Sequence, residues 1–476
     1  GIFEGNSIPA WDKTSKVPED FSFGEFQENF EHFEPYLASA IKRFPVLEKA
    51  GIRKFFSGPE SFTPDTNTLL GEVPEIKNFF VCCGLNSIGI GSGGGVGKVT
   101  AEWLMTGHIN EDIVSYDIKR CQRFHSELGF IKKRITESLG DLYGMHWPFK
   151  QHKTSRNVKT LPYHDNLKSF GACFGVSAGY ERPMWFALDG EKAEYEYSYN
   201  YQSWYPSAEY ETNNTVKNVG LFDLTPFSKF EIKSDKAHHE LQKICTANIK
   251  NEPGKCVYTH MLNPDGGIET DLTVVCVEND HFRIISSAAT RERDKFHIKK
   301  HISKNIELKD ITDDLCVFGL FGPKSRDLIK SISKDNFNNN DFKFGGGGRR
   351  LAAAASKDKI SRHRSMAAKF SQSPQKSINK GKSGSPVKHD PQQIYINLDI
   401  QEYRQWSSRQ DPILDQHIPA GTKLGIQILC YLGKPAVRTA ELAAEQIVPI
   451  VEQFVAAISD ENGKLDYQVH ASFHPF

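Results

Sequence analysis

The pattern of apolar and polar positions predicts a strand, a glycine-rich loop and a helix between residues 62 and 107. The apolar run FFVCC at residues 79–83 is typical of a buried strand. A glycine-dense loop is expected from Gly84 to Gly97, followed by a helix from Lys98 to Met105 that stops at Gly107. Glycine allows close approach of a ligand because it has no Cβ, and a helix start favours an anion. The same spacing also fits a tightly packed strand–helix turn.

Other stretches show two different periods. Helical spacing of apolar residues across residues 26–44, interrupted by Pro35, predicts a helix with one buried face. Residues 256–287 instead indicate at least three strands, with a turn at 263–267 between the first two. Residues 315–332 predict a strand, a Gly-Pro turn and a helix. We therefore expect α/β structure first, and then an α+β segment with antiparallel sheet.

The composition changes abruptly at Gly345. Residues 345–390 hold 11 Lys and Arg against 2 Asp and Glu, with almost no large apolar residues, so we expect a disordered basic linker. Contact with RNA is the alternative, but no interleaved aromatic residues support base stacking. Residues 391–476 contain a strand candidate, IYINLDI, and a helix candidate at 439–458, and stay an unassigned tail.

Charge and cysteine content exclude several classes of function. The 59 basic and 59 acidic residues balance, so no general attraction to nucleic acid or to membranes is expected. No apolar run approaches the roughly 18 residues of a membrane span. The 9 cysteines form no CxxC pair, which argues against a zinc ribbon or a redox motif and favours free thiols. No spacing of histidines and carboxylates indicates a metal site.

A series of motifs carries a family resemblance. They are GPESFTPD from Gly58, GLNSIG at 84–89, GGGVG at 93–97, FDLTPFSKF at 222–230, and YTHMLN with GGIETDLTV across 258–274. In this order and spacing they resemble the sarcosine and dimethylglycine dehydrogenase family. Within the family, GPESFTPD and NSIG are most similar to the motifs of sarcosine dehydrogenase. The resemblance covers residues 1–344.

The resemblance implies a domain order. Residues 1–108 would be the C-terminal part of a DAO-like FAD-dependent oxidoreductase domain, and residues 109–214 a connecting region. Residues 215–344 would be a partial aminomethyltransferase-like, folate-binding domain.

The resemblance also implies a function. A mitochondrial matrix flavoprotein would oxidise sarcosine, pass the one-carbon unit to tetrahydrofolate, and give electrons to an electron-transfer flavoprotein. The alternatives are a dimethylglycine dehydrogenase, or a non-catalytic regulatory subunit similar to that of pyruvate dehydrogenase phosphatase.

Two sets of site residues follow from the resemblance. The expected cofactor-binding residues, which would face the flavin, are Gly84, Leu85, Asn86, Ser87, Ile88 and Gly89. Asp271 is the expected catalytic carboxylate near the folate nitrogen that accepts the carbon, since a carboxylate can orient and deprotonate an amine. Asp271 could instead only solvate a turn. Glu269 lies two residues earlier and would share its strand face if the strand is regular, but no role follows for it from the sequence.

The chain departs from the family pattern in two places. The dinucleotide fingerprint GxGxxG of a βαβ unit is absent, and so is the histidine that carries covalent flavin. The glycines of GSGGGVG at 91–97 follow the wrong strand to be that fingerprint. We therefore expect the chain to begin after the FAD-anchoring half, which leaves its own enzymatic activity open. The match ends at Phe344, before the folate domain would be complete.

Overall fold

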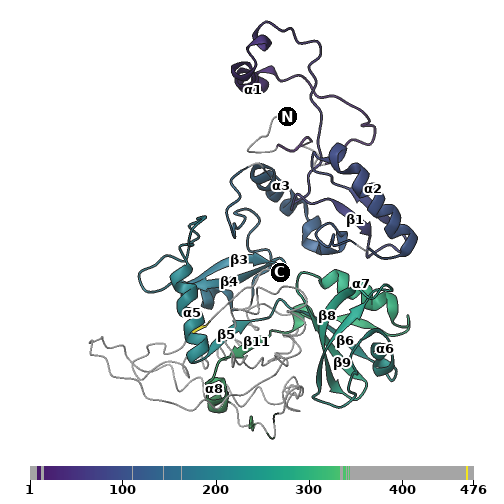
Figure 1. The fold of residues 1–476 in the computed structure, drawn as a ribbon, viewed down its shortest axis with the longest axis vertical. Helices are drawn as coiled ribbons and strands as arrows, with labels where there is room; N and C mark the ends of the chain where they lie inside the picture. Colours follow the sequence, from purple (N-terminus) through teal and green to yellow (C-terminus); the bar gives the residue numbers. More distant parts are fainter. Residues whose placement is uncertain are drawn as a thin grey trace. The chain divides into compact units, whose positions relative to one another are not determined.

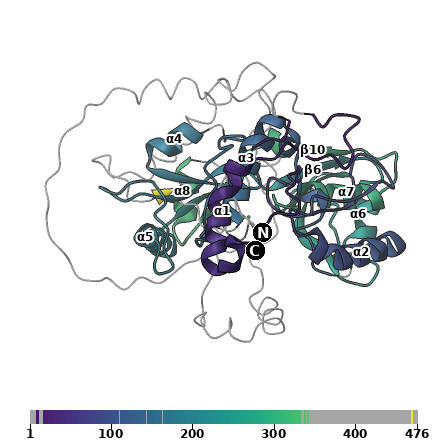
Figure 2. The same ribbon diagram turned by 90° about the horizontal axis from the view of Figure 1, so that it is seen from above.

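The computed structural model describes residues 8–11, 16–109, 111–142, 144–161, 163–332, 336–338, 340, 342 and 468–469. They belong to two compact units, 1–156 (unit 1) and 157–476 (unit 2), each described here by itself (Figures 1 and 2). The expected domain boundaries at 108, 214 and 344 stay predictions. The expected basic linker, and the strand and helix candidates of the tail, lie outside the described residues.

Unit 1 combines a two-stranded antiparallel sheet with helices. Its elements are α1 (Phe30–Arg43), η1 (Pro45–Glu48), β1 (Leu69–Glu72), β2 (Phe80–Cys83), α2 (Gly89–Thr106), η2 (Ile118–Arg120), η3 (Arg123–Ser126) and α3 (Leu128–Leu142).

The predicted first helix exists as α1, capped by Asn29, whose side chain accepts a hydrogen bond from the N–H of His32. Its predicted buried face is wrong, since no residue of α1 is buried. Its aromatic side chains meet Phe55 instead, at centroid distances of 6.2 Å for Phe30 and 5.2 Å for Phe33.

The expected strand is confirmed as β2, but Cys82 and Cys83 are exposed, so it is not a buried strand. The expected long glycine loop is wrong, because α2 begins at Gly89 and runs through the glycines of residues 91–97. Helix propensity is a weak preference, and the hydrogen-bond ladder continues through these glycines. The predicted end is confirmed, since Gly107 has φ 78° and donates to the carbonyl of Trp103.

Trp103 anchors α2 on β1. It is the buried residue of the helix, and its ring packs directly against Gly71, whose φ is +105°. A Cβ built at Gly71 would lie 2.2 Å from the ring. Lys119 lies 4.7 Å from the ring centroid and pairs with Asp117 at 3.1 Å. The position therefore requires glycine for both backbone conformation and space.

Unit 2 is built around antiparallel sheet. Its helices and strands are α4 (His164–Ser169), β3 (Ala172–Ser177), β4 (Tyr180–Phe186), α5 (Tyr205–Lys217), β5 (Gly220–Asp223), β6 (Ser228–Lys233), α6 (Ala237–Ile244), β7 (Cys256–Leu262), β8 (Ile268–Glu278), β9 (His281–Ser286), α7 (Arg291–His301), β10 (Leu308–Asp310), η4 (Thr312–Asp314), β11 (Phe318–Phe321), α8 (Ser325–Ile332) and β12 (Gln468–Val469).

The largest sheet of unit 2 has the order β10-β6-β9-β8-β7, with every pair antiparallel. Its inward side chains share one core with Leu241 of α6 and Ile298 of α7. The three strands expected within 256–287 are confirmed as β7, β8 and β9. The expected strand and helix at 315–332 are confirmed as β11 and α8.

Among the described residues, no helix has the length and apolar character to cross a membrane.

A matched pair of glycine substitutions tests the packing of α2. Gly71→Ala should lower the free energy of unfolding by about 2–4 kcal/mol, because the new Cβ meets the Trp103 ring at a left-handed φ. Gly94→Ala should instead raise it by up to about 1 kcal/mol, because a Cβ there meets nothing within 4 Å. Urea denaturation followed by tryptophan fluorescence measures both. Equal effects of the two substitutions would contradict this account.

Candidate functional site

The predicted flavin-facing segment Gly84–Gly89 links β2 to α2 and is held by a buried asparagine. Asn86 is 3% exposed and accepts a hydrogen bond from the N–H of Thr63 at 2.8 Å. Its amide also donates to the carbonyl of Gly84. Thr63 belongs to the FTPD motif, so the structure brings together two of the motifs that carried the resemblance. The side chain of Ser87 donates to Glu60, from the same GPESFTPD stretch.

The backbone of this segment is unusual. Gly84, Asn86 and Ser87 have φ of 67°, 49° and 67°. Positive φ at a non-glycine residue costs free energy, and it persists where surrounding contacts enforce it. Helix geometry leaves the N–H groups of Gly89 and Ile90 without an acceptor inside α2, whose first turn holds no acidic residue. The segment therefore presents N–H donors and a positive dipole end to an anion.

The predicted catalytic residue Asp271 lies on the exposed edge of the β7–β8 hairpin. It accepts a hydrogen bond from the hydroxyl of Tyr258 at 3.0 Å, and its cross-strand partner is His260. The Tyr258 and His260 rings meet edge to face at 5.2 Å. Burial, and then the charge of Asp271, raise the pKa of Tyr258 above its usual range. Tyr258 therefore stays a hydrogen-bond donor to Asp271 at neutral pH. Both ring residues belong to the YTHMLN motif, which by itself indicates no role for them.

Glu269 pairs with Arg293 in the first turn of α7, with Nη2 and Oε2 2.8 Å apart. The next residue of that helix, Asp294, is completely buried. Burial raises the pKa of Asp294 to about 6. Hydrogen bonds from the hydroxyls of Ser286, Thr290 and Thr270 act in the opposite direction and lower this pKa. Thr270, which lies between Glu269 and Asp271 on β8, is buried, and the β7–β8 register shifts at Glu269, because Met261 pairs with Thr270 and Leu262 with Ile268.

A buried polar cluster lies at the FDLTPFSKF motif. Tyr163 donates to Asp223 at 2.6 Å, and the fully buried Lys229 donates to the carbonyls of Thr225 and Phe227 at 2.6 and 3.0 Å. Burial lowers the pKa of Lys229 to about 8. These contacts hold the Thr-Pro turn between β5 and β6. Lys229 stands in the mixed polar and apolar strand SKFEIK, so the sequence alone gave no signal that it is buried.

Three potential metal ligands come together at the end of α3, although no sequence spacing indicated them. Ligand atoms of Glu137, Asp141 and His152 lie within 4.8 Å of one another. Glu137, however, already accepts hydrogen bonds from the N–H groups of Lys153 and Thr154 at 2.6 and 2.7 Å. Asp141 pairs with Lys150 at 2.5 Å. The cluster therefore fastens the 150–154 loop to α3 and offers little room for a cation.

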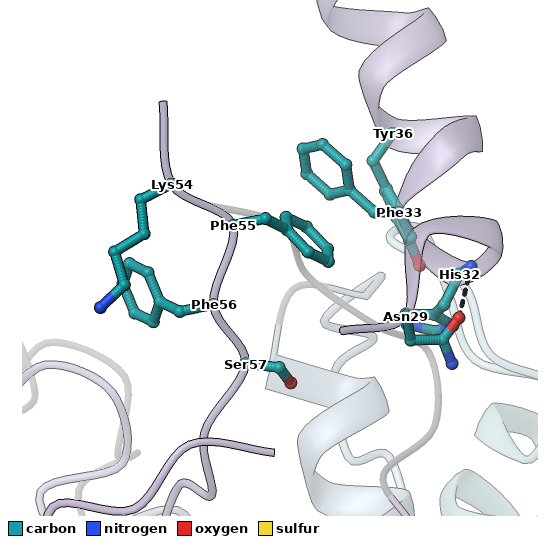
Figure 3. A pocket seen from close by; sticks show the side chains of 8 residues that line it. All are labelled: Asn29, His32, Phe33, Tyr36, Lys54, Phe55, Phe56 and Ser57. Carbon is teal, nitrogen blue, oxygen red and sulfur yellow. Dashed lines mark hydrogen bonds between the residues drawn. The ribbon is translucent and has the colours of Figure 1, made fainter. Parts of the chain in front are cut away.

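An open pocket of about 350 Å³ lies between α1 and residues 54–57 (Figure 3). Figure 3 shows the ring of Phe55 turned toward Phe33, with Lys54 and Phe56 on the other side of this chain segment. Lys54 pairs with Glu25 at 2.7 Å and lies over the Phe56 ring. The lining includes none of the predicted site residues, so the pocket adds no support to either predicted site.

Three family models match consecutive parts of the chain. Residues 9–103 match an FAD dependent oxidoreductase, residues 106–160 its central domain, and residues 163–362 a GCVT N-terminal domain. The chain therefore contains FAD-dependent oxidoreductase domains followed by an aminomethyltransferase-type domain. This order confirms the predicted fold class. It belongs to the sarcosine and dimethylglycine dehydrogenase family.

Three curated relatives illustrate the range of the family. A 4-methylaminobutanoate oxidase (formaldehyde-forming) of Paenarthrobacter nicotinovorans is 38% identical over 71% of this chain and 41% of its own length. Human mitochondrial sarcosine dehydrogenase is 32% identical over 72% of this chain and 42% of its own length. The mouse mitochondrial pyruvate dehydrogenase phosphatase regulatory subunit is 31% identical over 70% of this chain and 38% of its own length. The chain thus spans about two fifths of the length of these relatives.

Burial of Asp294 predicts a pH dependence of stability. Its folded pKa of about 6 exceeds the ordinary value of 3.8, so the folded state binds more protons between these values. Stability should therefore fall as pH rises from about 4 to above 6, by up to about 3 kcal/mol. In Asp294→Asn this loss should disappear, as measured by urea unfolding at pH 4.5 and 7.5. The exposed Asp271→Asn is the control and should keep the loss. If Asp294→Asn loses as much stability between pH 4.5 and 7.5 as the wild type, Asp294 is not the group responsible.

Proposed function

We propose that this chain is part of an FAD-dependent dehydrogenase for a small N-methyl amino acid, sarcosine, with transfer of the one-carbon unit to tetrahydrofolate. The observation that carries the proposal is the Tyr258–Asp271 pair, presented on the β7–β8 hairpin of the aminomethyltransferase-type domain. A dimethylglycine substrate is the nearest alternative within the same chemistry.

The residues of unit 1 fit one edge of a flavin. Bound FAD would accept the two electrons of amine oxidation and carry negative charge when reduced. The N–H groups at the start of α2, with the backbone of Gly84–Gly89, would lie toward this charge and stabilise it. Asn86 and its bond to Thr63 would hold the segment in its strained conformation. These residues orient the flavin and favour its reduced form, while the cofactor supplies the redox chemistry.

In unit 2, Asp271 would orient the folate amine that accepts the carbon and take up its proton. The hydroxyl of Tyr258 occupies one oxygen of Asp271 and fixes the carboxylate plane. Since Asp271 is exposed, the other side of the carboxylate can meet a ligand from solvent. We propose an electron-transfer flavoprotein as the electron acceptor and the mitochondrial matrix as the location, because several relatives carry mitochondrial names.

A second candidate is a non-catalytic regulatory subunit, which the similarity to the pyruvate dehydrogenase phosphatase regulatory subunit favours. The two candidates predict different behaviour of a purified protein that contains this chain together with an FAD-anchoring half. A dehydrogenase reduces a dye when sarcosine is added. A regulatory subunit instead retains a phosphatase catalytic subunit on an affinity column and shows no amine-dependent dye reduction.

Substitution of Asp271 tests the folate side directly. Asp271→Asn should weaken binding of 5-formyltetrahydrofolate, an air-stable probe, by about 10- to 100-fold, because a charge-assisted hydrogen bond is lost. Isothermal titration calorimetry on the purified chain measures this. Asp265→Asn, in the exposed turn of the same hairpin, is the matched control and should bind like the wild type. Unchanged affinity in Asp271→Asn would remove the proposed role of this residue.

A further inference from the structure

Two histidines stand four residues apart near the C-terminal end of α7. His297 and His301 lie about one helical turn apart, so both side chains leave the helix on the same face. Their ring centroids are 4.4 Å apart, with 45° between the ring planes. Two imidazoles that ligate one ion at an N–metal distance of about 2.1 Å place their centroids about 4.5 to 5.5 Å apart. The pair is therefore close to the separation that a shared ion requires.

The His301 ring is already oriented for ligation. Its Nδ1 lies 2.8 Å from the backbone carbonyl of His297, and a carbonyl oxygen only accepts, so Nδ1 carries the proton of this bond. In the neutral ring the lone pair is then on Nε2, which is the nitrogen left for a metal ion. A hydrogen bond at the other ring nitrogen fixes the tautomer and the ring plane of most metal-bound histidines. His301 is exposed, so an ion reaches it from solvent.

The His297 ring has no competing bond in the part of the chain that the structure describes. No hydrogen bond or ion pair of the described residues involves its ring nitrogens, and the ring that it contacts is that of His301. The cluster of Glu137, Asp141 and His152 differs in this respect. Its carboxylates are occupied by backbone N–H groups and by a lysine.

The charges around the histidine pair decide which ions fit. Arg293 and Lys300 are nearby cations that act on His297. Arg293 is paired with Glu269 at 2.8 Å, which offsets its charge, and the last turn of α7 adds the negative end of the helix dipole. The charge of Lys300 opposes ions such as Mg²⁺ and Ca²⁺, which also prefer oxygen ligands. Late first-row ions such as Ni²⁺ and Cu²⁺ bind imidazole strongly and fit the pair better.

We propose that His297 and His301 form a two-histidine site for a late first-row dication such as Ni²⁺ or Cu²⁺, with water in the other coordination positions. The bound ion links two turns at the end of α7 and stabilises the folded state by mass action. The site uses no residue of the proposed flavin or folate chemistry, so it goes beyond the proposed function and does not depend on it.

The test follows the imidazole signals of the whole chain by NMR. The chain is labelled with ¹⁵N at histidine, and the signals of His297 and His301 are identified by their loss in His297→Gln and His301→Gln. NiCl₂ is the probe, because Ni²⁺ is paramagnetic and does not oxidise the exposed thiols of Cys82 and Cys83. Both signals should broaden together below one equivalent of Ni²⁺, before those of the other histidines.

Single substitutions separate a shared ion from two independent contacts. In His297→Gln, broadening of the His301 signal should require about 10- to 100-fold more Ni²⁺, because the second ligand no longer acts at high effective concentration. His301→Gln should have the same effect on the His297 signal, and since His301 is exposed this variant should fold. His239→Gln, at an exposed histidine of α6, and His152→Gln are the controls and should leave both responses as in the wild type.

The outcomes are distinct. A rise of the melting temperature with Ni²⁺ that both His297→Gln and His301→Gln remove supports the site. If either signal keeps its wild-type response when the other histidine is replaced, the ion is an adventitious contact of one ring and the inference is overturned. Broadening that begins at His152 or at other histidines overturns it as well. Binding of 5-formyltetrahydrofolate should be the same in His301→Gln as in the wild type, so failure of the proposed function leaves the metal result unchanged.

Discussion

The register of the β7–β8 hairpin is the constraint on which the candidate site of unit 2 depends. Asn263 in the turn accepts hydrogen bonds from the N–H groups of Asp265 and Gly267 at 3.1 and 2.7 Å, and Gly266 adopts φ 83°. This turn pairs His260 with Asp271. A slip of one residue would move Asp271 to the core face and expose Thr270, because strand side chains alternate. The residues on the exposed face are thus set in part by the turn that fixes the register.

The two units stabilise their site segments by different means. In unit 2 a five-stranded sheet and two helices share one apolar core, and Asp271 pairs with His260 in a ladder whose register shifts at Glu269. In unit 1 polar side chains fasten irregular backbone. Arg120 binds Asp65 through two bonds of 2.6 and 3.0 Å and also donates to the carbonyl of Thr68. Asn86 does the same for the Gly84–Gly89 segment. Such bonds are directional, so they can hold the positive φ values of Gly84, Asn86 and Ser87.

Helix α7 connects several polar features of unit 2. Its first turn carries Arg291, bound to Asp310 and Asp313, then Arg293, bound to Glu269, and then the buried Asp294. A buried acid of raised pKa weakens the fold at neutral pH, while the flanking arginines tie the same turn to three carboxylates. Helix α7 is therefore held by the ion pairs of its first turn to residues of β8, β10 and η4 as well as by apolar contacts.

The sequence by itself determined the order of elements and the family. Alternation over 256–287 predicted β7 to β9, because a half-buried strand needs a period of two. Asp271 became a candidate through the resemblance of the GGIETDLTV motif to the family. Only the tertiary structure decided that α2 begins at Gly89, because helix continuation through glycine depends on contacts such as Trp103 on Gly71. It also decided the pairing of Glu269 with Arg293 and the burial of Lys229 and Asp294. These contacts join residues that are far apart in sequence or lie on different elements. The local pattern of apolar and polar residues does not predict which side chain contacts another element.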